Sequence, residues 1–142
     1  MNEILEEMLT NYGLSEIDGP LSHPDIMEFF YDIGFSWVKD DSTAWCSAAL
    51  NYFAKKHMYE RSGKLDARSW LKVGEIVLEP KLGDVVVFWR ESALSWKGHV
   101  GLYINHNEKY VWVLGGNTNN AIGIAAYPRD RLLGYRRLRH II

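Results

Sequence analysis

The sequence predicts an α+β fold, with helices in the first half and an antiparallel sheet in the second. Two observations support this class. Apolar residues before position 74 recur with helical spacing, whereas the later part contains short apolar runs separated by Gly, Asn and Asp. Elements segregated in this way are typical of α+β proteins rather than of alternating α/β proteins. With 142 residues, 47% of them apolar, we expect one domain that spans residues 1–142.

Four helices are expected, each with a recognisable start or stop. Pro24 after Ser22 suits a first helical turn, and Ser42 and Thr43 are candidate caps for the third helix. Glycines follow the first, second and fourth helices at Gly13, Gly34 and Gly74. The expected helices cover residues 4–9, 24–33, 45–56 and 66–72.

Five strands are expected after the turn at Pro80–Gly83. The second and third of them are joined by a five-residue hairpin loop over residues 105–109. The expected strands cover residues 84–89, 99–104, 110–114, 122–127 and 133–138.

Charge and hydropathy narrow the range of partners. The formal net charge is −2, which gives no electrostatic case for binding nucleic acid or an anionic membrane. The basic cluster of Arg136, Arg137 and Arg139 is too short to reverse this and is interpreted as a solvated strand end. The acidic start of the chain lacks the pattern of a signal peptide, and no apolar run approaches the ~20 residues of a membrane span. We therefore expect synthesis in the cytoplasm.

The single cysteine, Cys46, is the first candidate for chemistry. One cysteine excludes an internal disulfide, and no Cys/His cluster has zinc spacing, so we expect no metal and no cofactor. Cys46 falls in the first turn of the third helix, where unpaired N–H groups favour a thiolate and can also hold an oxyanion. The alternative is a small buried residue beside Ala48 and Ala49.

His99 is the candidate base among five histidines. It opens an apolar strand directly after Gly98, at the expected rim of the sheet. A base that serves a cysteine is distant in sequence and adjacent in space, which a helix packed on a sheet provides. Asn117, after Gly115 and Gly116, could accept the second ring N–H of His99 and fix its tautomer. The alternative for His99 is a histidine that only packs or lies at the surface, and the alternative for Asn117 is a residue of a plain turn.

Taken together, these residues resemble the NlpC-type and CHAP group of papain-like cell-wall peptidases and amidases, and more closely a phage-associated branch of single-domain proteins. The resemblance runs through most of the chain. Its pieces are Ala44-Trp45-Cys46-Ser47-Ala48, Ala67-Arg68-Ser69-Trp70-Leu71, Leu82-Gly83-Asp84-Val85-Val86-Val87-Phe88, Gly98-His99-Val100-Gly101-Leu102-Tyr103, Val113-Leu114-Gly115-Gly116-Asn117 and Leu133-Gly134-Tyr135-Arg136.

The resemblance implies a sheet of about six antiparallel strands with the cysteine helix packed on it. It also implies a cysteine peptidase or amidase that cleaves amide bonds of peptidoglycan, as an endopeptidase, an N-acetylmuramoyl-L-alanine amidase or a phage endolysin. Cys46, His99 and Asn117 would be catalytic, although Trp45 stands where such enzymes often have Asp or Asn. Such a protein acts on the cell wall after release or delivery, and we expect a monomer.

Substrate contacts are expected from aromatic residues around this site and from the loop before His99. Trp45, Trp96 and Tyr103 could line a cleft. Loop 90–98, which contains Trp96, is expected to face the substrate, because binding residues tend to lie on loops held by rigid elements.

Three other functions remain open at this point. A papain-like transglutaminase or deamidase toxin that acts on a protein would share the order of Cys46 and His99. A non-catalytic module on the same scaffold could bind cell wall without cutting it. The chain could also be an immunity or scaffolding protein with no chemistry.

Overall fold

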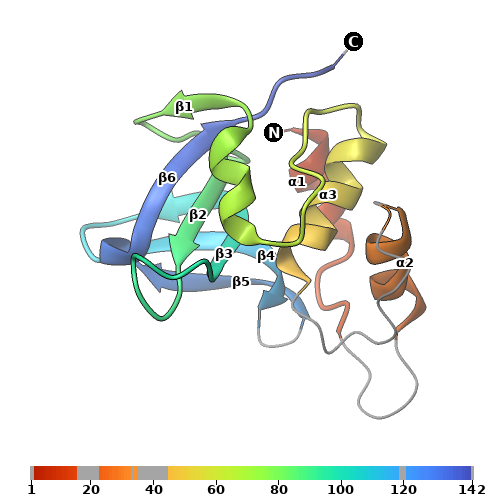
Figure 1. Ribbon diagram of the computed structural model, residues 1–142, viewed down its shortest axis with the longest axis horizontal. Helices are drawn as coiled ribbons and strands as arrows, with labels where there is room; N and C mark the ends of the chain where they lie inside the picture. The colour runs from red at the N-terminus through yellow and green to blue at the C-terminus, as the bar shows by residue number, and fades with distance from the viewer. Residues whose placement is uncertain (1, 16–22, 33, 35–44, 119–120, 142) are drawn as a thin grey trace.

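Three helices precede a six-stranded antiparallel sheet in the computed structural model, which describes residues 2–15, 23–32, 34, 45–118 and 121–141. Figure 1 shows α1, α2 and α3 together on one side of the sheet. The predicted α+β class is confirmed. In order, the elements are α1 (Glu3–Thr10), α2 (Pro24–Asp32), α3 (Cys46–Lys56), the 3₁₀ helix η1 (Ala67–Lys72), β1 (Glu75–Val77), β2 (Val85–Trp89), β3 (Gly98–His106), β4 (Tyr110–Thr118), β5 (Ala121–Pro128), the 3₁₀ helix η2 (Arg129–Arg131) and β6 (Leu132–Arg137).

The sheet has the strand order β1-β6-β2-β3-β4-β5, and it differs from the prediction in three places. Strand β1 was not predicted, because it has only three residues and its Ile76 side chain is exposed. Strand β4 continues to Thr118 rather than ending at Leu114. The hairpin loop has three residues rather than five, since the side chain of Asn107 accepts the backbone N–H groups of Lys109 and Tyr110 and closes it early.

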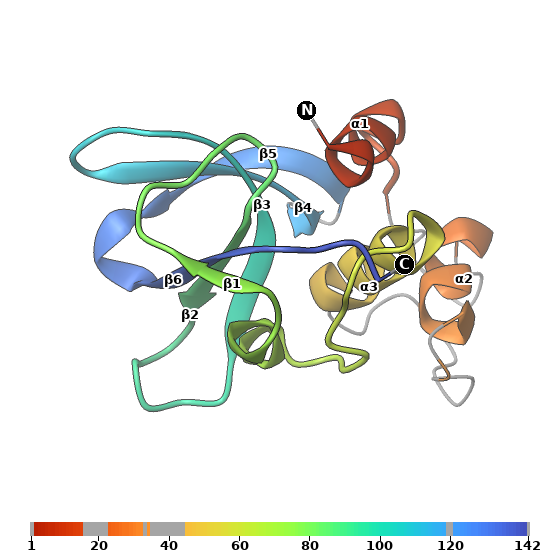
Figure 2. The same cartoon turned by 90° about the horizontal axis from the view of Figure 1, so that it is seen from above.

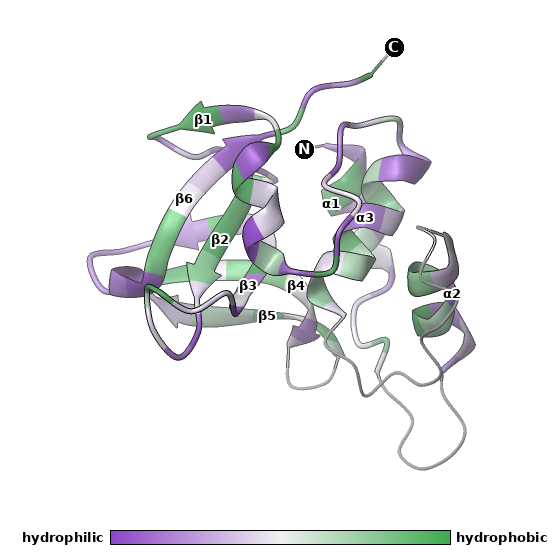
Figure 3. Cartoon of the chain, in the orientation of Figure 1, coloured by the Kyte–Doolittle hydropathy of each residue, from purple (hydrophilic) through white to green (hydrophobic). Residues whose placement is uncertain are grey.

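Strand residues point alternately to the two sides of a sheet. In this sheet the central strands carry apolar residues on both sides. None of the helices among the described residues is long and apolar enough to cross a membrane. Figure 3 shows β2 as hydrophobic along most of its length, as a strand buried on both faces must be. The face that packs with the helices presents Val85, Val87, Val100, Leu102, Leu114 and Ile122. The other face presents Val86, Phe88, Tyr103, Val111, Val113 and Tyr135.

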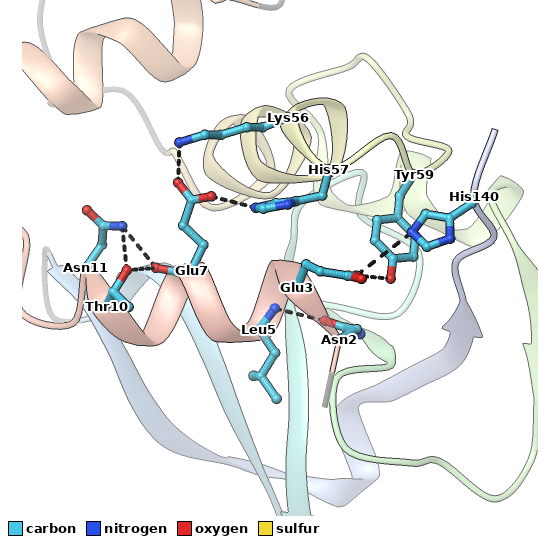
Figure 4. A network of polar contacts seen from close by, with 10 residues as sticks. All are labelled: Asn2, Glu3, Leu5, Glu7, Thr10, Asn11, Lys56, His57, Tyr59 and His140. Carbon is cyan, nitrogen blue, oxygen red and sulfur yellow. Dashed lines mark hydrogen bonds and ion pairs between the residues drawn. The ribbon is translucent and has the colours of Figure 1, made fainter. Parts of the chain in front are cut away.

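Helix α1 is attached to the end of α3 by a polar network (Figure 4). The Glu7 carboxylate contacts Lys56 Nζ at 2.6 Å and the His57 ring at 2.5 Å. The Glu3 carboxylate accepts a hydrogen bond from the Tyr59 hydroxyl. Figure 2, the view from above, shows α1 and α3 as neighbours, and these contacts fix the C-terminal end of α3.

A second polar network, centred on the buried side chains of Ser47, Asn51 and Trp70, fixes the other end of α3. Ser47, one residue after Cys46, donates to the Lys64 carbonyl at 2.6 Å and accepts from Trp70 Nε1 at 2.9 Å. Asn51, one turn further, donates to the same Lys64 carbonyl and accepts the Gly63 N–H. Every buried polar atom named here has a partner, so the start of α3 is bound to the following segment and to η1.

Ser47→Ala should therefore lower the free energy of unfolding by about 2 kcal/mol, because it leaves the buried Trp70 N–H without an acceptor and removes one of the two hydrogen bonds to the Lys64 carbonyl. Urea unfolding of the parent and the variant measures this. Ser69→Ala is the matched control, since the Ser69 hydroxyl donates only to the nearby Asp66 carbonyl, and it should cost less than half as much. Equal losses in the two variants would contradict the assignment.

Candidate active site

Cys46 is the first residue of α3, as the sequence predicted for a nucleophile. The N-cap position is taken by Trp45, whose side chain makes no capping hydrogen bond. Ser42 and Thr43, the expected caps, lie outside the described residues. The backbone amides of Val100 and Ser47 interact with the Cys46 sulfur in the sense that favours a thiolate.

The predicted readiness of Cys46 to ionise is not found in this conformation. The side chain is buried, with 5% exposure, and burial raises the pKa of the thiol. The amides and the positive charge of Arg90 act in the opposite direction but are smaller influences on the pKa. Burial outweighs the helix N-terminus in its effect on the thiol pKa because the two free energies differ in size. A helix N-terminus contributes about 0.3–1 kcal/mol, whereas removing a charge from water costs several kcal/mol.

His99 lies at the start of β3, directly opposite Phe88 on β2. Its ring stacks on Tyr127 of β5, with centroids 4.7 Å apart and planes 19° from parallel, and Tyr127 in turn stacks on Phe88. The His99 side chain is buried, and its Nε2 has no hydrogen-bond partner in the described part of the chain. Burial lowers the pKa of His99 to about 4, and the positive charge of Arg90 adds to this effect.

Three observations place Cys46 and His99 in the same neighbourhood. The amide that faces the Cys46 sulfur belongs to Val100, the residue next to His99. Tyr127, whose ring covers His99, has its pKa raised mainly by burial and further by the charge of Cys46. The Arg90 charge acts on the pKa of both Cys46 and His99. The two residues that the sequence singled out thus have Tyr127 and Arg90 as common neighbours, and burial favours the neutral form of each. Their pairing as nucleophile and base stays a prediction.

Gly115 and Gly116 make this close arrangement possible. They lie within β4, in a segment where the sequence also suggested a turn. A β-carbon at position 115 would lie 3.2 Å from His99 Nε2. One at position 116 would lie 2.7 Å from two carbons of the Trp45 indole. Glycine inside a strand often marks such an approach of another element. This signal was present in the sequence and could have been recognised.

Asn117 follows these glycines in a left-handed conformation, with φ of +57°. The register between β4 and β5 shifts at this point, between Gly115 and Thr118. Within the described residues no hydrogen bond joins the Asn117 side chain to His99. A left-handed residue breaks the alternation of a strand, and Asn tolerates it better than most side chains. The orienting role of Asn117 therefore stays a prediction.

The three predicted substrate-binding aromatics occupy different surroundings. Trp45 is fully buried and packs on Gly116 and Phe29, so in this structure it is a core residue and not a cleft wall. Tyr103 is buried four residues beyond His99, in the second apolar cluster, where its hydroxyl contacts His106. Its predicted contact with substrate stays a prediction. Trp96 is 71% exposed in the loop before His99 and remains available to a ligand.

Tyr127 is a site residue that the sequence analysis missed. The pattern of residues 122–127 predicted a strand, but the ring that Tyr127 would cover depends on strand order and register. Neither can be read from one strand alone.

The described residues form no second centre of this kind. Among the described residues, no three His, Cys, Asp or Glu side chains are grouped as metal ligands. A hollow of about 460 Å³ lies beside η1 and includes neither Cys46 nor His99. It is lined by Arg61, Ser62, Lys64, Asp66, Arg68, Ser69, Lys72 and Val73.

Comparison with known proteins identifies the fold. No protein-family model matches the sequence, and no curated protein matches it. A solved structure from Staphylococcus aureus, described as similar to a lipoprotein of the NLP/P60 family, superposes with a TM-score of 0.57 at 21% identity. The match covers 96% of this chain and 40% of that one. The helices and the antiparallel sheet thus form an NlpC/P60-like fold, which is the papain-like architecture that the sequence motifs predicted.

The low pKa of His99 predicts a specific dependence of stability on pH. Between pH 6.5 and about 4 the unfolded chain binds a proton at His99 that the folded chain excludes. The stability is thus fully present above pH 6.5 and declines as the pH falls towards 4, by about 3 kcal/mol over the whole window.

Urea unfolding at pH 7 and pH 4.5, performed on the parent and on His99→Gln, isolates this effect because the carboxylates contribute equally to both proteins. The parent should lose more stability than the variant on acidification. The same pH dependence in both proteins would show that His99 is not held neutral by burial.

Proposed function

We propose that this protein is a peptidoglycan hydrolase that cleaves an amide bond through Cys46 and His99. The observation that carries the proposal is their convergence. A helix-starting cysteine and a strand-starting histidine, 53 positions apart (99 − 46), have Tyr127 and the Arg90 charge in common, and the amide that faces the cysteine sulfur belongs to Val100, the residue after the histidine. Nucleophile and base in such an arrangement are typical of thiol acyl-transfer enzymes. The NlpC/P60-like fold, found in a protein described as similar to a lipoprotein, favours a cell-wall substrate.

The proposed reaction starts from two neutral groups. Neutral His99 takes the Cys46 proton as the sulfur attacks the scissile carbonyl, and the backbone N–H groups at the start of α3 hold the oxyanion. The carbon–nitrogen bond then breaks, and His99 gives its proton to the leaving amine. Water adds to the thioester, and the acid leaves while Cys46 regains its proton. Both side chains are nearly covered, so substrate reaches the sulfur only when the groups above it move.

The substrate surface in this proposal is loop 90–97. It carries the exposed Trp96 and Leu94, and it begins with Arg90, the cation that acts on both reacting groups. An exposed arginine at this position suits a substrate with a carboxylate, such as an acidic stem peptide. The finer assignment that we propose is a bacteriolytic endolysin of the CHAP or NlpC type, released or delivered to the wall.

Cys46→Ala should abolish release of soluble fragments from purified peptidoglycan, with a loss of about 10⁴-fold or more, because the nucleophile is removed. His99→Ala should lose roughly 10²- to 10⁴-fold, because general-base catalysis is removed. His106→Ala is the matched control, since His106 lies at the far end of the same strand. Mass spectrometry of the fragments also identifies the bond. A Cys46→Ala protein with more than a few per cent of the parent rate would disprove the mechanism.

Asn117→Ala tests the orienting group. If Asn117 accepts the His99 ring N–H in the substrate complex, turnover should fall by about 10- to 10³-fold, since the nucleophile and the base both remain. Asn117→Asp should retain more activity than Asn117→Ala because it keeps the accepting oxygen. Equal turnover of the parent and Asn117→Ala, at equal folded fraction, would remove this residue from the site.

A non-catalytic wall-binding module is the second candidate, and the covered thiol with its raised pKa is the observation that favours it. The same assay separates the two. A binding module would sediment with insoluble peptidoglycan and release no fragments, and Cys46→Ala would bind as the parent does.

A further inference from the structure

The loop between β2 and β3, residues 90–97, has a defined internal structure. The Arg90 N–H donates to the Lys97 carbonyl at 3.1 Å and closes the loop at its base. Within it, the Ser95 N–H donates to the Ser92 carbonyl, and the Lys97 N–H donates to the Ser95 hydroxyl. The Glu91 and Lys97 side chains form an ion pair across its ends. These bonds are short-range and lie at the surface, where each one alone contributes little.

One residue from another element holds this loop. Arg68 of η1 donates from Nε to the Lys97 carbonyl at 2.9 Å, from Nη1 to the Ala93 carbonyl at 2.8 Å and from Nη2 to the Ser92 carbonyl at 2.9 Å. A guanidinium presents its donors in a rigid, planar fork, so three such bonds fix both position and orientation. Helix η1 is in turn bound to Ser47 through Trp70, so loop 90–97 is held to the same frame as Cys46.

The side chains that this loop presents have no packing role of their own. Leu94 is 98% exposed and Trp96 is 71% exposed, with Lys97 Nζ 5.9 Å from the Trp96 ring. What sets these two exposed apolar side chains apart is that they lie on a loop fixed by three hydrogen bonds from Arg68, which would hold them ready for a ligand. The loop leads directly through Gly98 to His99.

We propose that Arg68 is a positioning residue for substrate binding, which holds loop 90–97 so that Trp96 meets the substrate beside His99. This inference rests on the proposed function and names the specificity surface of that site. His99 itself pairs with Phe88 and stacks on Tyr127, two contacts that do not involve Arg68. Loss of the Arg68 bonds therefore raises KM, because binding must order the loop, and leaves kcat nearly unchanged.

The experiment is a double-mutant cycle on soluble peptidoglycan fragments with the parent, Arg68→Gln, Trp96→Ala and the double variant. Each single change should raise KM about tenfold, and the double variant should be no more than about twofold worse than either, since Arg68 acts through the loop that carries Trp96. Arg68→Lys should resemble Arg68→Gln, because one ammonium group cannot reach three carbonyls. Arg61→Gln is the matched control. It removes a cation from the same hollow beside η1 and should leave KM unchanged.

Hydrogen exchange supplies a readout that does not need activity. The Ser95 and Lys97 amides should exchange about tenfold faster in Arg68→Gln than in the parent, while amides of β4 stay as they are. Unchanged exchange at both amides overturns the inference whatever the activity. An additive increase in KM in the double variant, or a fall in kcat at constant KM, also overturns it. A parent that cleaves no peptidoglycan overturns the proposed function instead, and the exchange rates then still decide whether Arg68 fixes the loop.

Discussion

The close approach of β4 to the start of α3 is the constraint on which the candidate site depends. Gly116 leaves room for the Trp45 indole, and Gly115 leaves room for the His99 ring. A side chain at position 116 would press on the Trp45 indole at the start of α3, and one at position 115 would press on the His99 ring. The polar network of Ser47 and Asn51 complements this packing, because it binds the same end of α3 to the segment at Lys64 and to η1.

Local chemistry made most of the fold predictable from sequence. Helical periodicity located α1 and α3, and Pro24 located the start of α2. Buried strands such as β2 were recognised as continuous apolar runs. The exposed β1 was missed, since three residues with one apolar side chain on the surface carry no periodic signal. Its pairing with β6 also depends on residues that are distant in the sequence.

The sequence singles out the candidate residues, whose roles stay proposals, but it says less about their environment. Cys46 and His99 follow from position within their elements and from motif order. The pKa of each depends on burial, which one sequence does not display, so the helix N-terminus suggested an easily ionised thiol where the structure has a covered one. The roles of Tyr127 and Trp45 depend on register and on the glycine pair, because only these decide which rings lie against β4.

In the proposed hydrolase, the burial of Cys46 and His99 has a consequence for how the site would work. A raised thiol pKa and a lowered imidazole pKa favour the neutral pair over the ion pair, so the reactive charges arise only when water is replaced by groups that stabilise them. A substrate that displaces covering side chains brings a carbonyl to the sulfur and exposes the helix N–H groups to the developing oxyanion. An oxyanion next to His99 favours the imidazolium, which offsets the effect of burial. Binding of the correct substrate would thus activate the pair, while the free protein keeps its one thiol protected from oxidation.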